Sequence, residues 1–163
     1  MNPGSNKTNT FQGSAAKLRI AVVVSKFNGH ITAKLLEGAE RCLRAHGIPD
    51  KNWKIVFCPG AFELPQVANQ IALQKKWDAI ICLGAVIRGD TPHFEYVSAE
   101  TARGIQDVAL RYSLPVVFGV LTTDNEKQAL DRVGGSQGHK GWDAALTALE
   151  MASLFKTLKR NLR

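Results

Sequence analysis

The sequence predicts an α/β protein with three layers, in which a central parallel sheet of four strands is covered by helices on both faces. Two observations support this prediction. Four apolar segments of strand length alternate with helical patterns along the chain, and such alternation produces right-handed crossovers and parallel strands. The 163 residues, 45% of them hydrophobic, suffice for one core. We therefore expect a single domain over residues 17–163. Residues 1–16 are rich in Asn, Ser, Thr and Gly, and we expect them to form a flexible arm.

The first strand is expected at Leu18–Val24, because this run is almost continuously apolar and largely β-branched. It ends at a polar stretch that contains Gly29. From Ile31 to about His46 the apolar residues recur every three or four positions, which predicts a helix that ends at Gly47.

The second strand is expected at Lys54–Cys58, followed by a helix after Pro65 that ends near Lys76. The third strand is expected at Ala79–Leu83. A turn that begins at Gly84 leads from it into a helix from Phe94 to about Tyr112.

The fourth strand is expected at Pro115–Leu121. Asp124 or Asn125 can cap a short helix that ends near Arg132. A loop over 134–141 then leads to a final amphipathic helix that carries apolar residues from Trp142 to Leu158.

The net charge is +7, but the basic residues are scattered, so we expect anionic small molecules as ligands rather than nucleic acid. The three cysteines, Cys42, Cys58 and Cys82, lie far apart among apolar residues, which predicts buried free thiols in a reducing compartment. No apolar run reaches membrane-spanning length and no signal-peptide core is present, so we expect no membrane association and a cytoplasmic location.

Unusual residues gather where the predicted strands end, which is where parallel sheets bind ligands. The turn after the third strand combines glycines, the charge of Arg88, a hydroxyl that could cap a helix at Thr91, and an imidazole at His93. A helix start of this kind favours an anion, and an imidazole moves protons near neutral pH. We expect an anion site with an acid/base group beside it.

Two further residues allow two interpretations each. Phe27 is either a core aromatic or a stacking face for a flat ring. Glu63 either complements a helix dipole or accepts hydrogen bonds from a polar ligand.

Two other candidate motifs lack the structural context that their functions require. The run Gly134-Gly135-Ser136-Gln137-Gly138 matches G-x-S-x-G, but it follows a helix, whereas a nucleophile elbow follows a strand. The four histidines are too dispersed for a metal cluster.

Several segments together resemble the lumazine synthase family. They are Ser25-Lys26-Phe27-Asn28, Pro59-Gly60-Ala61-Phe62-Glu63-Leu64-Pro65, Gly84-Ala85-Val86-Ile87-Arg88-Gly89-Asp90-Thr91-Pro92-His93-Phe94, Phe118-Gly119-Val120-Leu121-Thr122, Asp131-Arg132, Lys140-Gly141-Trp142 and Ala148-Leu149-Glu150-Met151-Ala152. The resemblance runs from about Leu18 to Leu158, in order and with matching spacing, and implies a flavodoxin-like fold.

The resemblance implies the penultimate reaction of riboflavin biosynthesis. In it, 5-amino-6-(D-ribitylamino)uracil condenses with 3,4-dihydroxy-2-butanone 4-phosphate to give 6,7-dimethyl-8-ribityllumazine, phosphate and water. Imine formation and phosphate loss need proton transfers but neither a metal nor an organic cofactor, so we expect no cofactor and no metal site.

By matching position, the resemblance also implies residue roles. His93 would transfer protons. Phe27 would stack on the pyrimidine, and Ala61 and Glu63 would hold the ribityl chain with Asn28 nearby. Ala85, Val86 and Ile87 would line the ring pocket through backbone groups, and Phe62 would be a further substrate-binding residue. Gly89, Asp90 and Thr91 would bind phosphate, Asp90 through its backbone. Phe118 and Arg132 would come from a neighbouring subunit, Arg132 to the phosphate, and Lys140 would lie near the polar end of the site.

The resemblance implies a homo-oligomer, either a pentamer or a shell of sixty subunits, with riboflavin synthase as a candidate partner. The short loop between Arg132 and Lys140 is similar to that of shell-forming members. The chain departs from the family pattern there, because Gly135 and Ser136 stand where Thr and Lys are common, and His139 stands where Asn is common.

Three alternatives remain open from the sequence. The chain could be a phosphate- or nucleotide-binding module without catalysis, from which His93 together with Arg132 would distinguish an enzyme. It could bind nucleic acid, against which the scattered charges argue. It could also be mainly a structural shell protein that retains the pocket.

Overall fold

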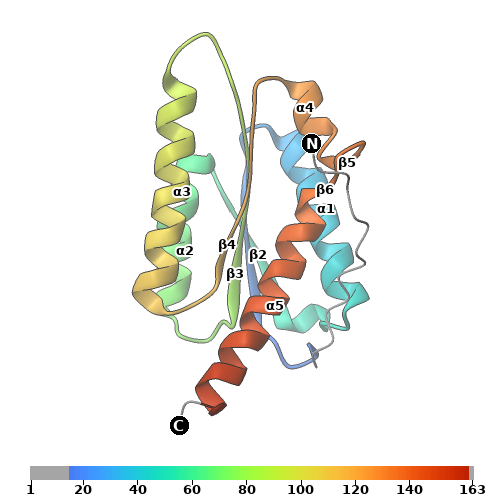
Figure 1. The fold of residues 1–163 in the computed structure, drawn as a ribbon, viewed down its shortest axis with the longest axis vertical. Helices are drawn as coiled ribbons and strands as arrows, with labels where there is room; N and C mark the ends of the chain where they lie inside the picture. The colour runs from blue at the N-terminus through green and yellow to red at the C-terminus, as the bar shows by residue number, and fades with distance from the viewer. Residues whose placement is uncertain (1–14, 162–163) are drawn as a thin grey trace.

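Four parallel strands form the middle layer of the molecule, in the order β2-β1-β3-β4 (Figure 1). They are β1 (Ile20–Ser25), β2 (Trp53–Cys58), β3 (Ala79–Ile87) and β4 (Val116–Thr123). The computed structural model describes residues 15–161, so all but the last two residues of the predicted arm lie outside the described part. The predicted α/β class with a parallel four-stranded sheet is confirmed.

Helices cover both faces of the sheet (Figure 1). One face carries α1 (Gly29–Ala45) and α5 (Lys140–Asn161), and the other carries α2 (Leu64–Leu73) and α3 (His93–Tyr112). The smaller elements are the 3₁₀ turns η1 (Asp50–Asn52) and η2 (Ala61–Glu63), the helix α4 (Glu126–Leu130), and the antiparallel pair β5 (Val133–Gly135) and β6 (Gly138–His139).

The central strand β1 shows why helices must cover both faces of the sheet. Ile20, Val22 and Val24 pack towards α1 and α5, while Ala21 and Val23 pack towards α2 and α3. Each of these side chains is buried. A strand buried on both faces reads as a continuous apolar run, which is the pattern that the sequence shows.

Strand β3 is longer than predicted. The turn expected to begin at Gly84 is wrong, because β3 pairs with β4 as far as Ile87 opposite Thr123. Gly84 lies in a closely packed part of the strand instead: a Cβ on this residue would lie 3.1 Å from Leu64 Cδ1 and 3.2 Å from Ser25 Oγ. The extension brings Ala85, Val86 and Ile87 into the strand, which still packs against the core and reaches the region where α3 begins.

The segments after β4 differ from the predictions in two places and agree with them in one. The predicted loop over 134–141 contains the β5–β6 pair, and α5 starts at Lys140 rather than near Trp142. The expected cap of α4 is confirmed at Asn125, whose side chain accepts a hydrogen bond from the backbone N–H of Gln128 at 2.9 Å.

The three cysteines are buried free thiols, as predicted: Cys42, Cys58 and Cys82. Burial, with a smaller contribution from Asp143, raises the pKa of Cys42 to about 12. Ala15, inside the predicted arm, is buried, and the carbonyl of Ala16 accepts a hydrogen bond from Asn52 Nδ2 at 2.9 Å.

None of the helices within residues 15–161 combines the length and the hydropathy that a membrane-spanning segment needs.

Candidate active site

The carboxyl ends of the parallel strands surround a cavity of about 640 Å³, which we call the strand-end cavity. This is the position where open parallel sheets bind ligands. Ten of the predicted site residues line it together: Phe27, Ala61, Phe62, Glu63, Ala85, Val86, Ile87, Gly89, Thr91 and His93. They come from the segment after β1, from η2, from the end of β3, from the turn between β3 and α3, and from the start of α3.

The segment after β1 holds Phe27 at the cavity with its ring facing outwards. The side chain is 70% exposed, so Phe27 is not a core aromatic. Its backbone N–H donates to the carbonyl of Pro59 at 3.0 Å, and Asn28 beside it has a left-handed φ of 55°. Asn tolerates that conformation better than most residues. An exposed ring on a fixed backbone is suited to stacking against a flat ligand.

Asn28 does not line the cavity. Its Nδ2 donates to the carbonyl of Ala85 at 2.9 Å, which ties the segment after β1 to the end of β3. Its own carbonyl accepts from the backbone N–H of Ile31 at 2.9 Å, where α1 begins. Asn28 therefore positions the two backbone segments that border the cavity.

Glu63 stands at the junction of η2 and α2, where it is the N-cap residue of α2. Leu64 is buried beside it and Pro65 occupies the start of the helix, which fixes the direction of the chain. The half-buried carboxylate lies over Gly60, where a Cβ would come within 3.0 Å of Glu63 Oε2. This arrangement presents a carboxylate to the cavity as an acceptor for hydroxyl or N–H groups.

The turn from β3 to α3 provides backbone groups and an imidazole. Gly89, Asp90 and Thr91 are exposed, and His93 is the first residue of α3. The expectation that Thr91 caps the helix is wrong, because the N-cap residue is Pro92 and no side chain caps this end. A helix N-terminus leaves several N–H groups without helical partners, and its dipole favours an anion.

Arg88 does not offer a free positive charge to this turn. Its guanidinium forms an ion pair with Glu95, and its Nε donates to Asp124 Oδ1 at 2.9 Å. The guanidinium also lies over the ring of Phe94, 4.2 Å from the ring centroid. The hydrogen bonds with Glu95 and then Asp124 raise the pKa of Arg88, and the bond from Arg88 lowers the pKa of Glu95.

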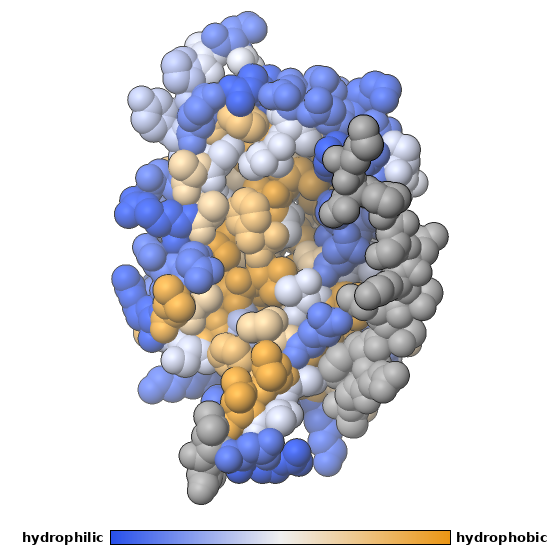
Figure 2. All heavy atoms as spheres, in the orientation of Figure 1, coloured by the Kyte–Doolittle hydropathy of each residue, from blue (hydrophilic) through white to orange (hydrophobic). Residues whose placement is uncertain are grey.

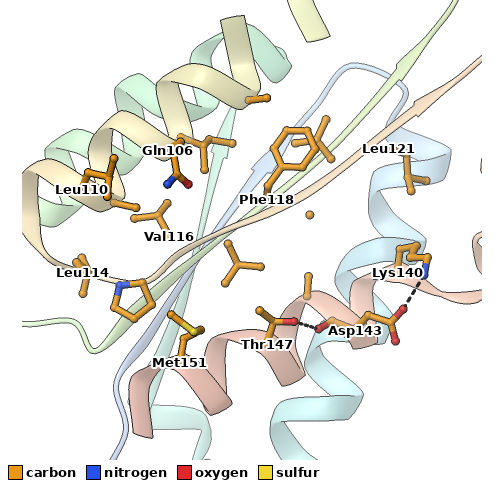
Figure 3. Close-up of a pocket in the computed structure, with 18 of the residues that line it drawn as sticks. Gln106, Leu110, Leu114, Val116, Phe118, Leu121, Lys140, Asp143, Thr147 and Met151 are labelled. Carbon is orange, nitrogen blue, oxygen red and sulfur yellow. Dashed lines mark hydrogen bonds and ion pairs between the residues drawn. The ribbon is translucent and has the colours of Figure 1, made fainter. Parts of the chain in front are cut away.

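A second cavity, of about 610 Å³, lies over β4 between α3 and α5, and we call it the β4 cavity (Figure 3). Phe118 from β4, Gln106 and Leu110 from α3, and Lys140 and Met151 from α5 are among its lining residues. Figure 2 shows hydrophobic side chains gathered between the two helices, with hydrophilic ones around them. None of its lining residues also lines the strand-end cavity.

The predicted site residues therefore fall into three groups. Ten share the strand-end cavity, while Phe118 and Lys140 line the β4 cavity. Phe118 is 43% exposed, and Lys140 Nζ forms an ion pair with Asp143 Oδ2 at 3.0 Å. Asn28, Asp90 and Arg132 line neither cavity, and Arg132 Nη1 donates to the carbonyl of Gln128 at 2.8 Å.

Sequence analysis missed five residues that line the strand-end cavity: Pro59, Gly60, Phe94, Tyr96 and Val97. A signal for two of them was present, because Tyr96 and Val97 are three and four positions after His93 on one helix face. Tyr96 is 70% exposed and lies in the first turn of α3. Phe94 lies in the same segment as Arg88 and His93.

Across residues 15–161, no three side chains of His, Cys, Asp or Glu are grouped so that they could hold a metal ion. The polar groups of the strand-end cavity are a carboxylate, an imidazole, two hydroxyls and backbone groups. Such a set can bind a polar ring compound and an anion, and it can transfer protons.

Comparison with known proteins agrees with this geometry. The family model described as 6,7-dimethyl-8-ribityllumazine synthase matches residues 17–156. Two proteins of Clostridium kluyveri, one from each of two strains and both named 6,7-dimethyl-8-ribityllumazine synthase, are 49% identical to this chain over 146 residues. The alignment covers 90% of this chain and 95% of each relative. The chain therefore belongs to the 6,7-dimethyl-8-ribityllumazine synthase family.

Proposed function

We propose that the strand-end cavity is where this chain carries out the reaction of its family, the condensation that completes 6,7-dimethyl-8-ribityllumazine. The substrates are 5-amino-6-(D-ribitylamino)uracil and 3,4-dihydroxy-2-butanone 4-phosphate, and phosphate and water leave. The observation that carries the proposal is that Phe27, Glu63 and His93, from three separate segments, line one cavity. The chain is then a transferase of riboflavin biosynthesis.

One end of the cavity fits the pyrimidine substrate. The exposed ring of Phe27 stacks on the pyrimidine, and Ala85, Val86 and Ile87 line the ring pocket at the end of β3. Glu63 accepts hydrogen bonds from the ribityl hydroxyls. Ala61 and Phe62 border the same chain, and Asn28 holds the backbone beside it.

The other end fits the phosphate substrate. The backbone of Gly89, Asp90 and Thr91 surrounds the phosphate at the N-terminus of α3, where the helix dipole favours an anion. The side chains around this turn carry one guanidinium, that of Arg88, against three carboxylates, those of Asp90, Glu95 and Asp124. A phosphate there needs a further cation, which supports a role for Arg132 from outside this cavity.

His93, the first residue of α3, follows the phosphate turn and transfers protons. The amine of the pyrimidine attacks the ketone and one water leaves to form the imine. Phosphate is then eliminated, and a second water leaves when the ribitylamino nitrogen closes the ring on the remaining carbonyl. Each of these steps moves a proton, and an imidazole can accept and return it near neutral pH. Holding the two substrates in one cavity supplies a further share of the rate acceleration.

A second copy of the chain supplies Phe118, Arg132 and Lys140. What supports this is that none of the three lines the strand-end cavity, while Phe118 and Lys140 lie in an apolar cavity on another part of the surface. A head-to-tail contact repeated around a closed ring joins the two surfaces at each interface. We propose a pentamer, or a shell of sixty subunits built from pentamers, with riboflavin synthase as a partner.

The proposal also includes a single catalytic domain over residues 17–163, with residues 1–16 as an arm, and a cytoplasmic location. The family match over 17–156 supports the domain, and the three free, buried cysteines support a reducing compartment.

The decisive experiment mixes the purified protein with both substrates and follows the fluorescence of the lumazine product, with no metal or cofactor added. Product above the uncatalysed background is expected. A protein that binds both substrates but gives only the background rate would be a binding module or a structural relic.

A further inference from the structure

The side chain of Arg88 joins three segments: the end of β3 and the start of α3, which both border the strand-end cavity, and the residues just after β4. It projects from the end of β3, pairs with Glu95 in the first turn of α3, and donates to Asp124 just after β4. Phe94 lies under the guanidinium, and the backbone N–H of Arg88 donates to the carbonyl of Thr123 at 2.9 Å. The residues between Arg88 and Phe94, which include the phosphate turn and His93, are thus fixed at both ends.

Because of these pairings, the guanidinium of Arg88 is not free to bind a ligand in the strand-end cavity. Two carboxylates and an aromatic ring occupy its guanidinium, and Arg88 is not among the residues that line the strand-end cavity. A guanidinium presents a planar fork that can bind two carboxylates at fixed angles, whereas an ammonium is a point charge. The arrangement therefore uses the geometry of arginine, not only its charge.

We propose that Arg88 is a positioning residue, which with Glu95 and Asp124 holds the backbone of Gly89–Thr91 in the conformation that binds a phosphate group. The inference rests on the proposed function for the identity of the phosphate substrate, but the phosphate turn itself can be tested with inorganic phosphate. Its distinctive consequence is that two acidic residues near an anion site strengthen anion binding.

The two roles that Arg88 could have predict opposite changes in phosphate affinity when its carboxylate partners are removed. If Arg88 is a positioning residue, Glu95→Gln and Asp124→Asn loosen the turn and weaken phosphate binding. If Arg88 is instead a direct ligand, the same substitutions free its charge and strengthen phosphate binding. Because the pairs are exposed, each substitution should change the dissociation constant by about two- to fivefold.

The experiment measures binding of inorganic phosphate by calorimetry at low ionic strength, and the KM of each substrate in the fluorescence assay. Glu95→Gln, Asp124→Asn and Arg88→Lys are compared with Glu100→Gln as the matched control. Glu100 lies on the same helix and pairs with Arg103, so this control removes a carboxylate of the same charge away from the turn. Thermal unfolding verifies that each variant folds.

Weaker phosphate binding and a higher KM for the phosphate substrate are expected in all three variants, with an unchanged KM for the pyrimidine and an unchanged control. Tighter phosphate binding in Glu95→Gln and Asp124→Asn would overturn the proposal, as would effects no larger than those of Glu100→Gln. A wild-type chain that does not bind phosphate at all would also overturn it. If the wild type binds phosphate but makes no lumazine, the proposed function fails, and calorimetry still decides the role of Arg88.

Discussion

His93 is the only histidine among the described residues that lines the strand-end cavity. It begins α3 and its side chain is exposed, so substrate can reach the ring. Its neighbours in the cavity are aromatic and aliphatic side chains together with the carboxylate of Glu63. Because the side chain is exposed, removing the imidazole should affect proton transfer without disturbing the fold.

His93→Ala should therefore lower kcat with little change in the affinity for either substrate. General acid–base groups contribute about a hundredfold to ten-thousandfold to a rate. The lumazine assay gives kcat, and calorimetry with the pyrimidine alone gives its affinity. His30→Ala is the control, because His30 is also exposed but pairs with Glu126 away from the cavity. An unchanged kcat in His93→Ala would remove this residue from the mechanism.

His139 is a second histidine with a defined environment. Its ring lies directly against Gly38 on α1, where a Cβ would overlap the imidazole. Its strand pairs with β5, and the N–H of Lys140 beside it donates to the carbonyl of Arg132 at 2.8 Å. Desolvation, and then the charge of Arg41, lower the pKa of His139, while its backbone hydrogen bond and the carboxylates of Asp143 and Glu37 act in the opposite direction.

This lowered pKa predicts a loss of stability in acid. Below about pH 6.5 the histidine of the unfolded chain binds a proton, while the folded chain still holds the ring neutral. The free energy of unfolding should therefore fall as the pH drops below that value, and the loss should stop growing once the pH passes the lower pKa of the folded state. His139→Asn should lose less stability than the wild type between about pH 7.5 and 5.5, in urea unfolding at fixed protein concentration. Parallel curves for the two proteins would show that His139 does not titrate in this way.

At the scale of elements, α1 and α5 cross at a glycine. Gly141, the second residue of α5, lies against the backbone of α1, and a Cβ there would overlap the carbonyl oxygen of Leu35. Because the obstacle is backbone, the helices would have to separate to make room. This contact fixes the start of α5, and with it the position of Lys140.

Gly141→Ala should destabilise the protein by about 1–3 kcal/mol or more, as expected when a packed core is overfilled. Gly29→Ala is the matched control, since Gly29 begins α1 and a Cβ added there would meet nothing within 4 Å. That change should be neutral or slightly stabilising, because alanine favours a helix more than glycine does. Thermal and urea unfolding measure both variants, and equal stabilities would contradict a close helix crossing at Gly141.

At the scale of the whole molecule, the two cavities belong to different parts of the surface. The strand-end cavity provides Phe27, Glu63 and His93, while the β4 cavity provides Phe118 and Lys140. If a ring of subunits joins one surface to the other, each site contains residues from two chains. Two variants with defects on opposite surfaces can then restore each other.

Phe27→Ala and Arg132→Ala should each be nearly inactive alone. After the two are unfolded, mixed equally and refolded together, about a quarter of the interfaces should combine two intact surfaces. Lumazine formation should therefore return to roughly that fraction of the wild-type rate, and only after subunits exchange.

Phe27→Ala mixed with His93→Ala is the matched control. Both substitutions lie in the strand-end cavity, so every interface of a mixed ring retains one defect and activity should not return. If mixed rings of Phe27→Ala and Arg132→Ala form but remain inactive, Phe27 and Arg132 act within one chain and the shared-site proposal is wrong.

The layers of the fold and most of the strand-end cavity follow from the amino-acid sequence. Continuous apolar runs such as that of β1 indicate strands buried on both faces. In a parallel sheet the residues after such strands must meet at one edge. For this reason the order of strands and helices along the chain was enough to place Phe27, Glu63 and His93 together.

Contacts between remote segments depended instead on tertiary packing. Gly84 read as a turn residue because local sequence cannot show that Leu64 packs against it in a strand. Arg88 was expected to add a fixed positive charge to the anion site, and the sequence could not show that Asp124, thirty-six positions away in the chain, pairs with it. Side-chain pairing and close packing join residues that are remote in sequence, so the folded chain determined which charges are paired and which apolar surfaces stay exposed.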